Sequence, residues 1–293
     1  MTLRVATRGS DLARRQAERV VDLLGGDAEL LVVTTTGDRR ADVPIHAMGG
    51  TGVFVKEVQQ AVLDERADLA VHSAKDLPSE TPAGLLLAAV PERADPRDAL
   101  VGSTLGALPT GAVVATGSVR RRAQIAALRP DVGFAELRGN IPTRLEKADR
   151  FDAIVVAAAA LDRLGLGDRI AERLEPSVVL PQVGQGALAV ECRADDDPTV
   201  ARLRAIDDID AHRAVDAERA FLGELGGGCN LPCAALAHSG GDGVTIEVLL
   251  GSLDGRVVLR SRATGDEPAA VGRDAARQLL DRHGGRMLLE DIA

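Results

Sequence analysis

Aromatic side chains are nearly absent from the sequence, which has no Trp, no Tyr and four Phe among 293 residues. Proteins that bind single-stranded nucleic acid stack its bases on such rings, so this class of function is poorly supported. The formal net charge of −9 argues the same way, because no strongly cationic segment offsets the acidic residues. We therefore expect no nucleic-acid partner.

Long apolar runs and a disulfide framework are also missing. No charge-free apolar stretch reaches the length of about 18 residues that suggests a membrane span, and the chain opens on a strand-like LRVAT without a signal-peptide core. Three cysteines, an odd number, suggest a reducing compartment. We predict a cytoplasmic protein with no membrane partner. No metal is expected, because Cys229, Cys233 and His238 lack the spacing of common zinc sites.

Lysine is scarce, with three lysines against 32 arginines. One of them lies in 68-DLAVHSAKDLP-78, where a short apolar run of strand type leads into a turn that carries His72, Ser73, Lys75 and Asp76. Open α/β sheets bind their ligands at such strand ends. A Lys-Asp dipeptide taken alone is more often a solvated pair, so the rest of the chain must decide between the two interpretations.

Two chemical roles are open for this turn. Asp76, if it is held beside cations in a partly dry cleft, can protonate a leaving amine or stabilise the cation that remains. Lys75 can instead form a Schiff base, which requires a lowered pKa. His72 is more often a hydrogen-bonded histidine at a strand end than a catalyst.

The chain repeats one plan of elements. Residues 4–20 resemble residues 112–128, because each segment has a strand ending in Ala-Thr, a Gly-Ser turn and a helix with early arginines. Chance similarity between two βαβ units remains open. Residues 91–99 and 176–198 have the composition of crossovers, and two crossovers make a hinge. We predict two similar α/β lobes that face each other across a cleft.

Arginines and hydroxyl groups gather at the starts of predicted helices and in turns. Helix N-termini offer free N–H groups, and arginine binds carboxylate or phosphate in bidentate fashion. Neither a Walker-type loop nor a G-x-G-x-x-G helix start is present, so carboxylate is favoured over phosphate. A run such as 120-RRR-122 is often a solvated face, which we assign to Arg122. The arginines and hydroxyl residues that we expect to bind an anionic ligand are Arg8, Ser10, Thr116, Ser118, Arg120, Arg121, Arg138, Arg144 and Arg163.

A third, smaller α+β part is predicted near the C-terminus. A helix over 209–225 ends in three glycines, a strong stop signal, and a strand, a hairpin turning at 253–255 and a helix over 268–284 follow. Cys229 stands on the Gly-rich turn, where its thiol can reach outward, although a lone cysteine on such a loop is usually incidental. Cys192 and Cys233 have the apolar neighbours of buried residues.

These segments resemble the hydroxymethylbilane synthase family, also called porphobilinogen deaminase, over essentially the whole chain. The matching motifs are ATRGS, GGTGVFVKE, ADLAVHSAKDLP, ERADPRDA, ATGSVRRR, LRGNIPTRLEK, DAIVVAAAALDRLGL, LPQVGQGALAVECR, AERAFL and GGGCN. The resemblance implies two similar periplasmic-binding-protein-like (type II) lobes with a hinge and a cleft, plus a small C-terminal α+β domain. The expected domains are 1–92 plus 184–204, 96–180, and 208–293.

The resemblance also implies an activity. Such an enzyme deaminates and polymerises four porphobilinogen molecules head to tail on a covalently bound dipyrromethane primer, and then releases linear hydroxymethylbilane by hydrolysis. The primer would be joined to Cys229 by a thioether, and Asp76 would be the catalytic carboxylate. A monomer is expected.

The family's binding roles carry over to residues that match its motifs. The dipyrromethane cofactor would be held by Ser73, Lys75, Thr116, Ser118, Arg120, Arg121, Arg138 and Arg144. The substrate would be held by Arg8, Ser10, Gln16, Arg163 and Gln185. Carboxylate arms on both ligands would supply the negative charge that these cations need.

Two departures and two alternatives accompany the resemblance. Thr51 stands where many relatives have a lysine, and Gly9 stands where a longer polar residue is frequent, which would loosen that turn. A non-catalytic bilobal carboxylate-binding protein would explain the lobes and the arginines, but not GGGCN or the third domain. A Schiff-base lyase that uses Lys75 is the rival enzyme.

Overall fold

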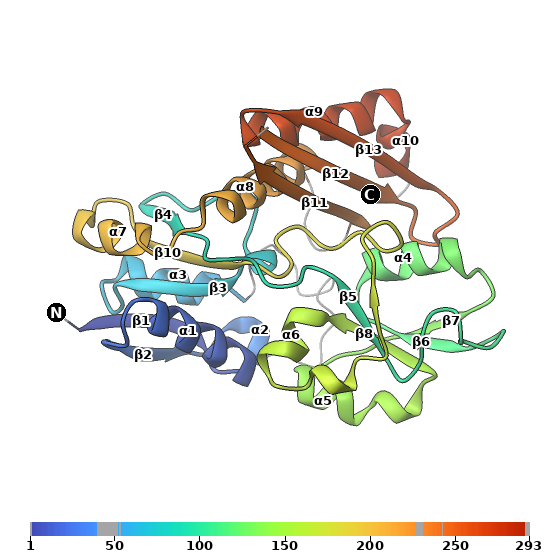
Figure 1. Ribbon diagram of the computed structural model, residues 1–293, viewed down its shortest axis with the longest axis horizontal. Coiled ribbons are helices and arrows are strands. Elements are labelled where there is room, and N and C mark those ends of the chain that lie inside the picture. The colour runs from blue at the N-terminus through green and yellow to red at the C-terminus, as the bar shows by residue number, and fades with distance from the viewer. Residues whose placement is uncertain (1, 40–51, 53, 227–230, 242, 291–293) are drawn as a thin grey trace.

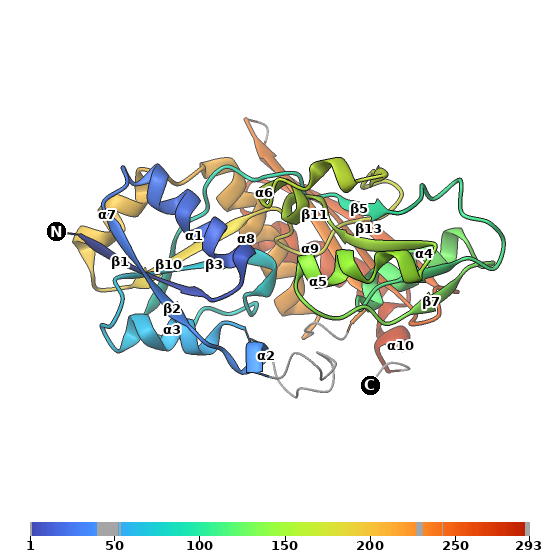
Figure 2. The same cartoon turned by 90° about the horizontal axis from the view of Figure 1, so that it is seen from below.

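The computed structural model describes residues 2–39, 52, 54–226, 231–241 and 243–290. The strands in this part of the chain form three sheets, two of five strands and one of three. Figure 1 shows the two five-stranded sheets side by side, with the three-stranded sheet and its helices above them. Figure 2 shows the same two lobes from below, with the N-terminal one on the left.

The first sheet has the strand order β2-β1-β3-β10-β4. β1 pairs in parallel with β2 and β3, whereas β10 runs antiparallel to β3 and β4. Val5, Ala6, Leu69 and Ala70 are fully buried on successive positions, as expected for strands covered on both faces. The strands are β1 (Leu3–Arg8), β2 (Ala28–Val33), β3 (Leu69–Ser73), β4 (Leu85–Ala89) and β10 (Leu188–Arg193).

The second sheet has the order β7-β6-β8-β5-β9. β6 pairs in parallel with β7 and β8, whereas β5 runs antiparallel to β8 and β9. All five residues of β8 are buried. The strands are β5 (Asp98–Val101), β6 (Val113–Ala115), β7 (Gly133–Ala135), β8 (Ala153–Ala157) and β9 (Glu172–Leu174).

The two sheets share one topology. In each, the first strand of a parallel trio lies between the second and third, and an antiparallel strand follows the third. The chain passes from β4 in the first lobe to β5 in the second, and returns from β9 to β10. These two crossovers confirm the predicted bilobal fold class, and the matching strand orders show that the repeat is structural.

The helices of the two lobes follow the strand-turn-helix plan. Ser10 and Ser118 are equivalent N-caps, because the hydroxyl of each accepts a hydrogen bond from the backbone N–H three residues later, at 3.3 and 3.4 Å. The lobes contain α1 (Asp11–Leu23), α2 (Thr36–Arg39), α3 (Lys56–Leu63), α4 (Val119–Leu128), α5 (Ile141–Glu146), α6 (Ala158–Arg163) and α7 (Asp197–Arg204). The described part of the lobes also has the short 3₁₀ turns η2 (Ala74–Asp76), η3 (Ala148–Arg150) and η4 (Gly167–Arg169).

The C-terminal part packs helices on one face of an antiparallel sheet of order β11-β12-β13. Gly272 lets its two longest helices approach closely, because a Cβ at this position would lie 2.0 Å from the carbonyl oxygen of Ala217. The predicted helices over 209–225 and 268–284 and the hairpin are confirmed. The elements are α8 (Ile209–Glu224), β11 (Cys233–Gly240), β12 (Gly243–Gly251), β13 (Val258–Gly265), α9 (Pro268–Arg282) and α10 (Gly285–Glu290).

Helix α8 also packs on the first lobe. Ala211 and Val215 join a buried cluster with Ala74 and Leu77, which flank the Lys75-Asp76 turn, and with Val90. The C-terminal part is thereby held against the strand-end turn that the sequence singled out.

Buried Glu218 is the centre of a second contact. Its carboxylate accepts hydrogen bonds from Arg93 in one crossover at 2.6 and 3.1 Å, from the backbone N–H of Gly184 in the other crossover at 2.6 Å, and from the backbone N–H of Ala237 in β11 at 2.8 Å. One carboxylate of α8 therefore joins both crossovers and the third sheet.

The structure differs from the sequence-based expectations mainly inside the crossovers. Strand β5 begins at Asp98, within the segment 91–99 that composition marks as a connection. The proline and charged residues of this segment outweigh the short apolar run Ala99-Leu100-Val101 in its composition. That run is buried, and β5 lies between β8 and β9 in the sheet.

Candidate active site

The Lys75-Asp76 turn is built by strand β3 and clamped by the returning crossover. β3 ends at Ser73, and both Lys75 and Asp76 are partly buried. The N–H of Ala74 donates to the carbonyl of Ala187 at 3.0 Å. Gly184, with φ of 70°, approaches so closely that a Cβ there would lie 2.8 Å from the Ala74 carbonyl carbon. The turn therefore has little freedom to move away from the crossover.

Arg120 and Arg121, in the first turn of α4, meet the buried carboxylate of Asp98. Arg120 Nη1 donates to Asp98 Oδ2 at 2.7 Å, and Arg121 Nε donates to Asp98 Oδ1 at 2.9 Å. Burial alone would raise the pKa of Asp98, but the two guanidinium groups bring that pKa well below its ordinary value. Asp98 is therefore an anion that neutralises one of two adjacent cations.

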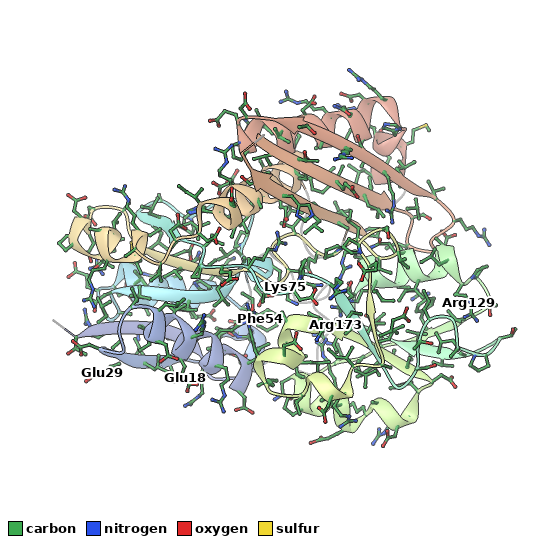
Figure 3. The ribbon with its side chains drawn as sticks, viewed as in Figure 1. Glu18, Glu29, Phe54, Lys75, Arg129 and Arg173 are labelled. Atoms are coloured by element: carbon green, nitrogen blue, oxygen red, sulfur yellow. The ribbon has the colours of Figure 1, made fainter. Side chains whose placement is uncertain are left out.

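The positive charges of Arg120 and Arg121 in the second lobe act on Lys75 in the first lobe. Burial, and then the positive charge of Arg121, lowers the pKa of Lys75 to about 8, while the charges of Asp76 and Asp98 oppose the shift. Burial and Arg121 also lower the pKa of Arg144 to about 10, again against the charge of Asp76. Figure 3 shows Lys75 near the middle of the molecule, between the two lobes. The charge of Asp76 thus acts on one cation of each lobe, Lys75 and Arg144.

The pKa of Lys75 gives a testable pH dependence. Because this pKa is lowered, Lys75 loses its positive charge as the pH rises through about 8, so the ligand-free site should bind anions more weakly at pH 9 than at pH 7. Lys75→Arg should remove most of this change, since arginine stays protonated. With three lysines in the chain, lysine side-chain NMR would follow the titration and Lys75→Arg would assign the signal. A titration midpoint near 10.5 for the Lys75 signal, which is the ordinary pKa of lysine, would contradict the lowered pKa of Lys75.

The remaining predicted residues of the second lobe lie around the same helix start or near α5. Thr116 is buried, and its hydroxyl accepts from the N–H of Ser118 at 3.2 Å. Arg144 Nε donates to the carbonyl of Gly139 at 2.8 Å, and Arg138 contributes to the lowered pKa of Arg144. Arg122 is exposed, as predicted, and its guanidinium lies 5.6 Å from the centre of the Phe134 ring.

Arg8 of the first lobe already contacts a carboxylate of its own chain. Its Nη2 donates to Asp38 Oδ1 at 2.5 Å, and its guanidinium lies 4.2 Å from the centre of the Phe54 ring. The amide of Gln16 donates to the Ser73 hydroxyl at 2.8 Å. A ligand carboxylate that binds Arg8 must share it with Asp38 or displace Asp38.

Arg163 and Gln185 contact the crossovers. Arg163 Nη2 donates to the carbonyl of Gly186 at 2.7 Å, and burial lowers the pKa of Arg163 to about 10. Gln185 Nε2 donates to the carbonyl of Pro96 at 2.7 Å and to Asp98 Oδ1 at 2.9 Å. In this structure both side chains are therefore engaged by the connections between the lobes.

Three cysteines and one histidine complete the predicted set. Cys229 and Thr51 lie outside the described residues. Cys192 and Cys233 are buried, as predicted. His72 is buried on β3, with Nε2 at 3.2 Å from the carboxylate of Glu191.

The described residues offer neither a metal site nor a membrane span. In that part of the chain no group of three or more His, Cys, Asp or Glu residues could hold a metal ion. Its helices are also too short or too polar to cross a membrane.

Sequence reasoning missed Asp98 and Glu218. Both are fully buried carboxylates that bind arginine and one or both crossovers. Asp98 sits in the Pro- and charge-rich segment 91–99, and Glu218 lies in a helix among other charged residues. A charged residue within an apolar stripe would have been the signal for Glu218, since Val215 and Phe221 on the same helix are buried.

The family models and the curated relatives that match this chain carry the same family name. The model of the porphobilinogen deaminase dipyrromethane cofactor binding domain matches residues 3–201, and that of the porphobilinogen deaminase C-terminal domain matches residues 212–281. The chain is 47% identical to the porphobilinogen deaminase of Brevibacillus brevis, covering 98% of this chain and 96% of that protein. It is 49% identical to the porphobilinogen deaminase of Roseiflexus sp., covering 98% of each.

Solved structures show a more distant likeness. One is the VFT2 domain of BvgS from Bordetella pertussis, with a TM-score of 0.40 and 19% identity over 74% of this chain and 91% of that one. These values support no inference about function. The two domain models, matched in chain order, and the near-half identity over almost the full length assign the chain: it belongs to the porphobilinogen deaminase family.

Proposed function

We propose that this chain joins four porphobilinogen molecules head to tail on a covalently bound dipyrromethane, loses one ammonia at each addition, and releases linear hydroxymethylbilane by hydrolysis. Family membership supports this proposal. The observation that carries it is that charges from both lobes act on one site: Arg121 and Asp76 each act on the pKa of Lys75 and on that of Arg144. An aminomethyl pyrrole with carboxylate arms offers negative charge to those cations and an amine to that carboxylate.

The dipyrromethane cofactor fits the charge of this site. Burial, and then the positive charge of Arg121, lowers the pKa of Lys75 and of Arg144, so a bound anion would stabilise the charged form of both groups. We propose that Ser73, Lys75 and the second-lobe residues Thr116, Ser118, Arg120, Arg121, Arg138 and Arg144 hold the cofactor, with Cys229 as its thioether ligand. When bound, the cofactor supplies the pyrrole to which the first substrate is joined.

Asp76 is the proposed catalytic residue. Its carboxyl group would give a proton to the departing amine of the substrate, and its carboxylate would stabilise the pyrrolic cation left behind. Arg8, Ser10, Gln16, Arg163 and Gln185 would hold the substrate's carboxylate arms, once ligand contacts replace those that several of them make within the chain. The buried surroundings limit the entry of water.

The organisation of the chain follows the same proposal. Domain 1 would comprise residues 1–92 and 184–204, domain 2 residues 96–180, and domain 3 residues 208–293, in accord with the three sheets. We propose that the protein works as a monomer in the cytoplasm, as a biosynthetic enzyme acting on a small molecule.

Intact mass followed by peptide mapping tests this function. Protein produced with access to porphobilinogen should show a mass excess of two linked pyrrole units, on the peptide that contains Cys229. Protein produced without such access should lack the excess, and Cys229→Ser should lack it in both cases. An unmodified Cys229 in protein that had access to porphobilinogen would favour a non-catalytic carboxylate-binding role.

The lowered pKa of Lys75 favours a second candidate. A lysine with a pKa of about 8 is partly neutral near physiological pH, as a Schiff-base lysine requires. A Schiff base forms when the amine of Lys75 condenses with an aldehyde or ketone and releases water, so this candidate requires a carbonyl substrate instead of porphobilinogen. Borohydride added in the presence of such a substrate would reduce the imine to a stable secondary amine on Lys75. An adduct found on Cys229, with Lys75 unmodified, would exclude this second mechanism.

A further inference from the structure

Asp98 occupies an unusual place in the site. It is the first residue of β5, where the first crossover enters the second lobe, and its side chain is fully buried. A ligand in the cleft cannot reach a carboxylate that is enclosed in this way. Any influence of Asp98 on the reaction must pass through the groups that it contacts.

Those contacts come from two separate segments, helix α4 and the returning crossover. Oδ1 accepts from Arg121 Nε at 2.9 Å and from Gln185 Nε2 at 2.9 Å, and Arg121 Nη2 also lies 2.7 Å from it. Oδ2 accepts from Arg120 Nη1 at 2.7 Å. Gln185 belongs to the returning crossover and donates in addition to Pro96 in the first crossover. The carboxylate thus connects both crossovers with the first turn of α4.

The two arginines bound to Asp98 are not equivalent. Arg120 Nη1 also donates to the carbonyl of Leu180 at 2.8 Å, and Arg120 contributes least to the lowered pKa of Lys75. Arg121 is the largest cationic influence on the pKa of both Lys75 and Arg144. Of the two arginines, Arg121 therefore has the stronger repulsive effect on Lys75.

Repulsion from Lys75 and Arg144 should drive Arg121 away from this position unless an anion retains it. Arg121 is held by Asp98 on one side and by the carbonyl of Val155, at 2.9 Å, on the other. A carbonyl contributes only a partial charge, so most of the restraint comes from the carboxylate.

We propose that Asp98 is the positioning residue for Arg121: it holds this guanidinium beside Lys75 and links its orientation to both crossovers between the lobes. The inference rests on the proposed function in one respect, that Arg121 serves the anionic ligand. The link to the crossovers means that a change in the angle between the lobes reorients Arg121.

A double-mutant cycle on the titration of Lys75 tests the positioning. The four proteins are the wild type, Asp98→Asn, Arg121→Gln and the double variant, all full-length and produced without porphobilinogen, so that they are compared in one state. When Arg121 is absent, Asp98→Asn removes only an attractive charge and should lower the pKa of Lys75. When Arg121 is present, Asp98→Asn should also release a repelling cation.

Asp98→Asn should therefore change the pKa of Lys75 by different amounts in the two backgrounds, with and without Arg121. The two changes should differ by at least about 0.4 of a pH unit, and the change should be more positive when Arg121 is present. Equal shifts in the two backgrounds would overturn the proposal, and so would a more negative shift when Arg121 is present. A loss of stability alone would not produce the expected difference. If Asp98→Asn does not fold, Asp98→Glu keeps the charge, displaces it by one methylene, and enters the same cycle.

Kinetics of the cofactor-loaded protein give a second measurement. Asp98→Asn should raise the KM for porphobilinogen by about tenfold or more and change KM more than kcat. The matched control is Asp95→Asn, in the same crossover, which binds Arg97 and Arg173 instead of α4 and should change KM less than about twofold. Equal effects in the two variants would contradict positioning through Arg121. Failure of the wild type to consume porphobilinogen would refute the proposed function and leave the lysine titration interpretable.

Discussion

Asp76→Asn should lower the kcat for porphobilinogen consumption by about 10²–10⁴-fold, the usual contribution of a positioned acid or base. Asparagine keeps the shape of the side chain but can neither deliver the proton nor carry the negative charge. Lys75 and Arg144 would then lose the negative charge of Asp76, which favours their protonated forms, and a pyrrolic cation formed there would lose the carboxylate proposed to stabilise it. Substrate binding should change much less than kcat, because the cations that attract carboxylate arms remain.

Initial rates of porphobilinogen consumption, measured with intact mass on the same samples, check this expectation. Glu80→Gln is a suitable control, since Glu80 is an exposed carboxylate four residues along the same loop, and it should retain nearly full turnover. The cofactor state must be recorded for each protein, because a variant without the adduct would be inactive for a different reason. Undiminished turnover by loaded Asp76→Asn would remove Asp76 from the catalytic role.

Glu218→Ala should destabilise the protein strongly, lowering the free energy of unfolding by about 3–5 kcal/mol. The substitution leaves Arg93 without its carboxylate in a buried position, and it leaves the N–H groups of Gly184 and Ala237 without their acceptor. Both crossovers and β11 lose a common contact at once. The third sheet should loosen from the lobes before either lobe unfolds.

Urea or thermal denaturation, followed by circular dichroism, measures the effect. The matched control is Glu224→Ala on the same helix, because Glu224 pairs with Arg277 at 2.9 Å on the surface, where a salt bridge contributes about 0–1 kcal/mol. A loss below about 1 kcal/mol for Glu218→Ala would show that the buried pair is replaceable. A separate early transition in this variant, absent from the control, would locate the loss at the contact between α8 and the crossovers.

Much of the fold could be predicted because its signals are local. Two short segments with the same sequence pattern predict that Ser10 and Ser118 are equivalent helix N-caps. The alternation of apolar and polar residues around a turn predicts the hairpin of β12 and β13. The extent of β5 could not be predicted, because four residues after a proline carry too little periodicity. Strand β5 exists because β8 and β9 supply hydrogen-bond partners on both of its sides.

The candidate site was predictable in its types of residue and not in their contacts. Arginine at a helix start suggests anion binding, but nothing in the sequence near Arg120 indicates that its anion is Asp98, 22 residues earlier. The contact of Arg163 with the carbonyl of Gly186 likewise depends on how the second lobe meets the returning crossover. Such contacts form only when segments that are distant in the sequence pack together, so local sequence patterns do not predict them.

The return of the chain to the first lobe, after it has built the second, also bears on how the protein is synthesised. Every strand of the second sheet lies between Asp98 and Leu174, so that sheet can be completed as soon as this segment has left the ribosome. The first sheet lacks β10, residues Leu188–Arg193, until later, and β3 and β4 meanwhile present unpaired edges. Although domains generally fold in the order in which they are made, the N-terminal sheet of this protein is completed only after the second lobe has been made. Until then β3 has an open edge and β4 has no partner strand, and both can pair with other chains.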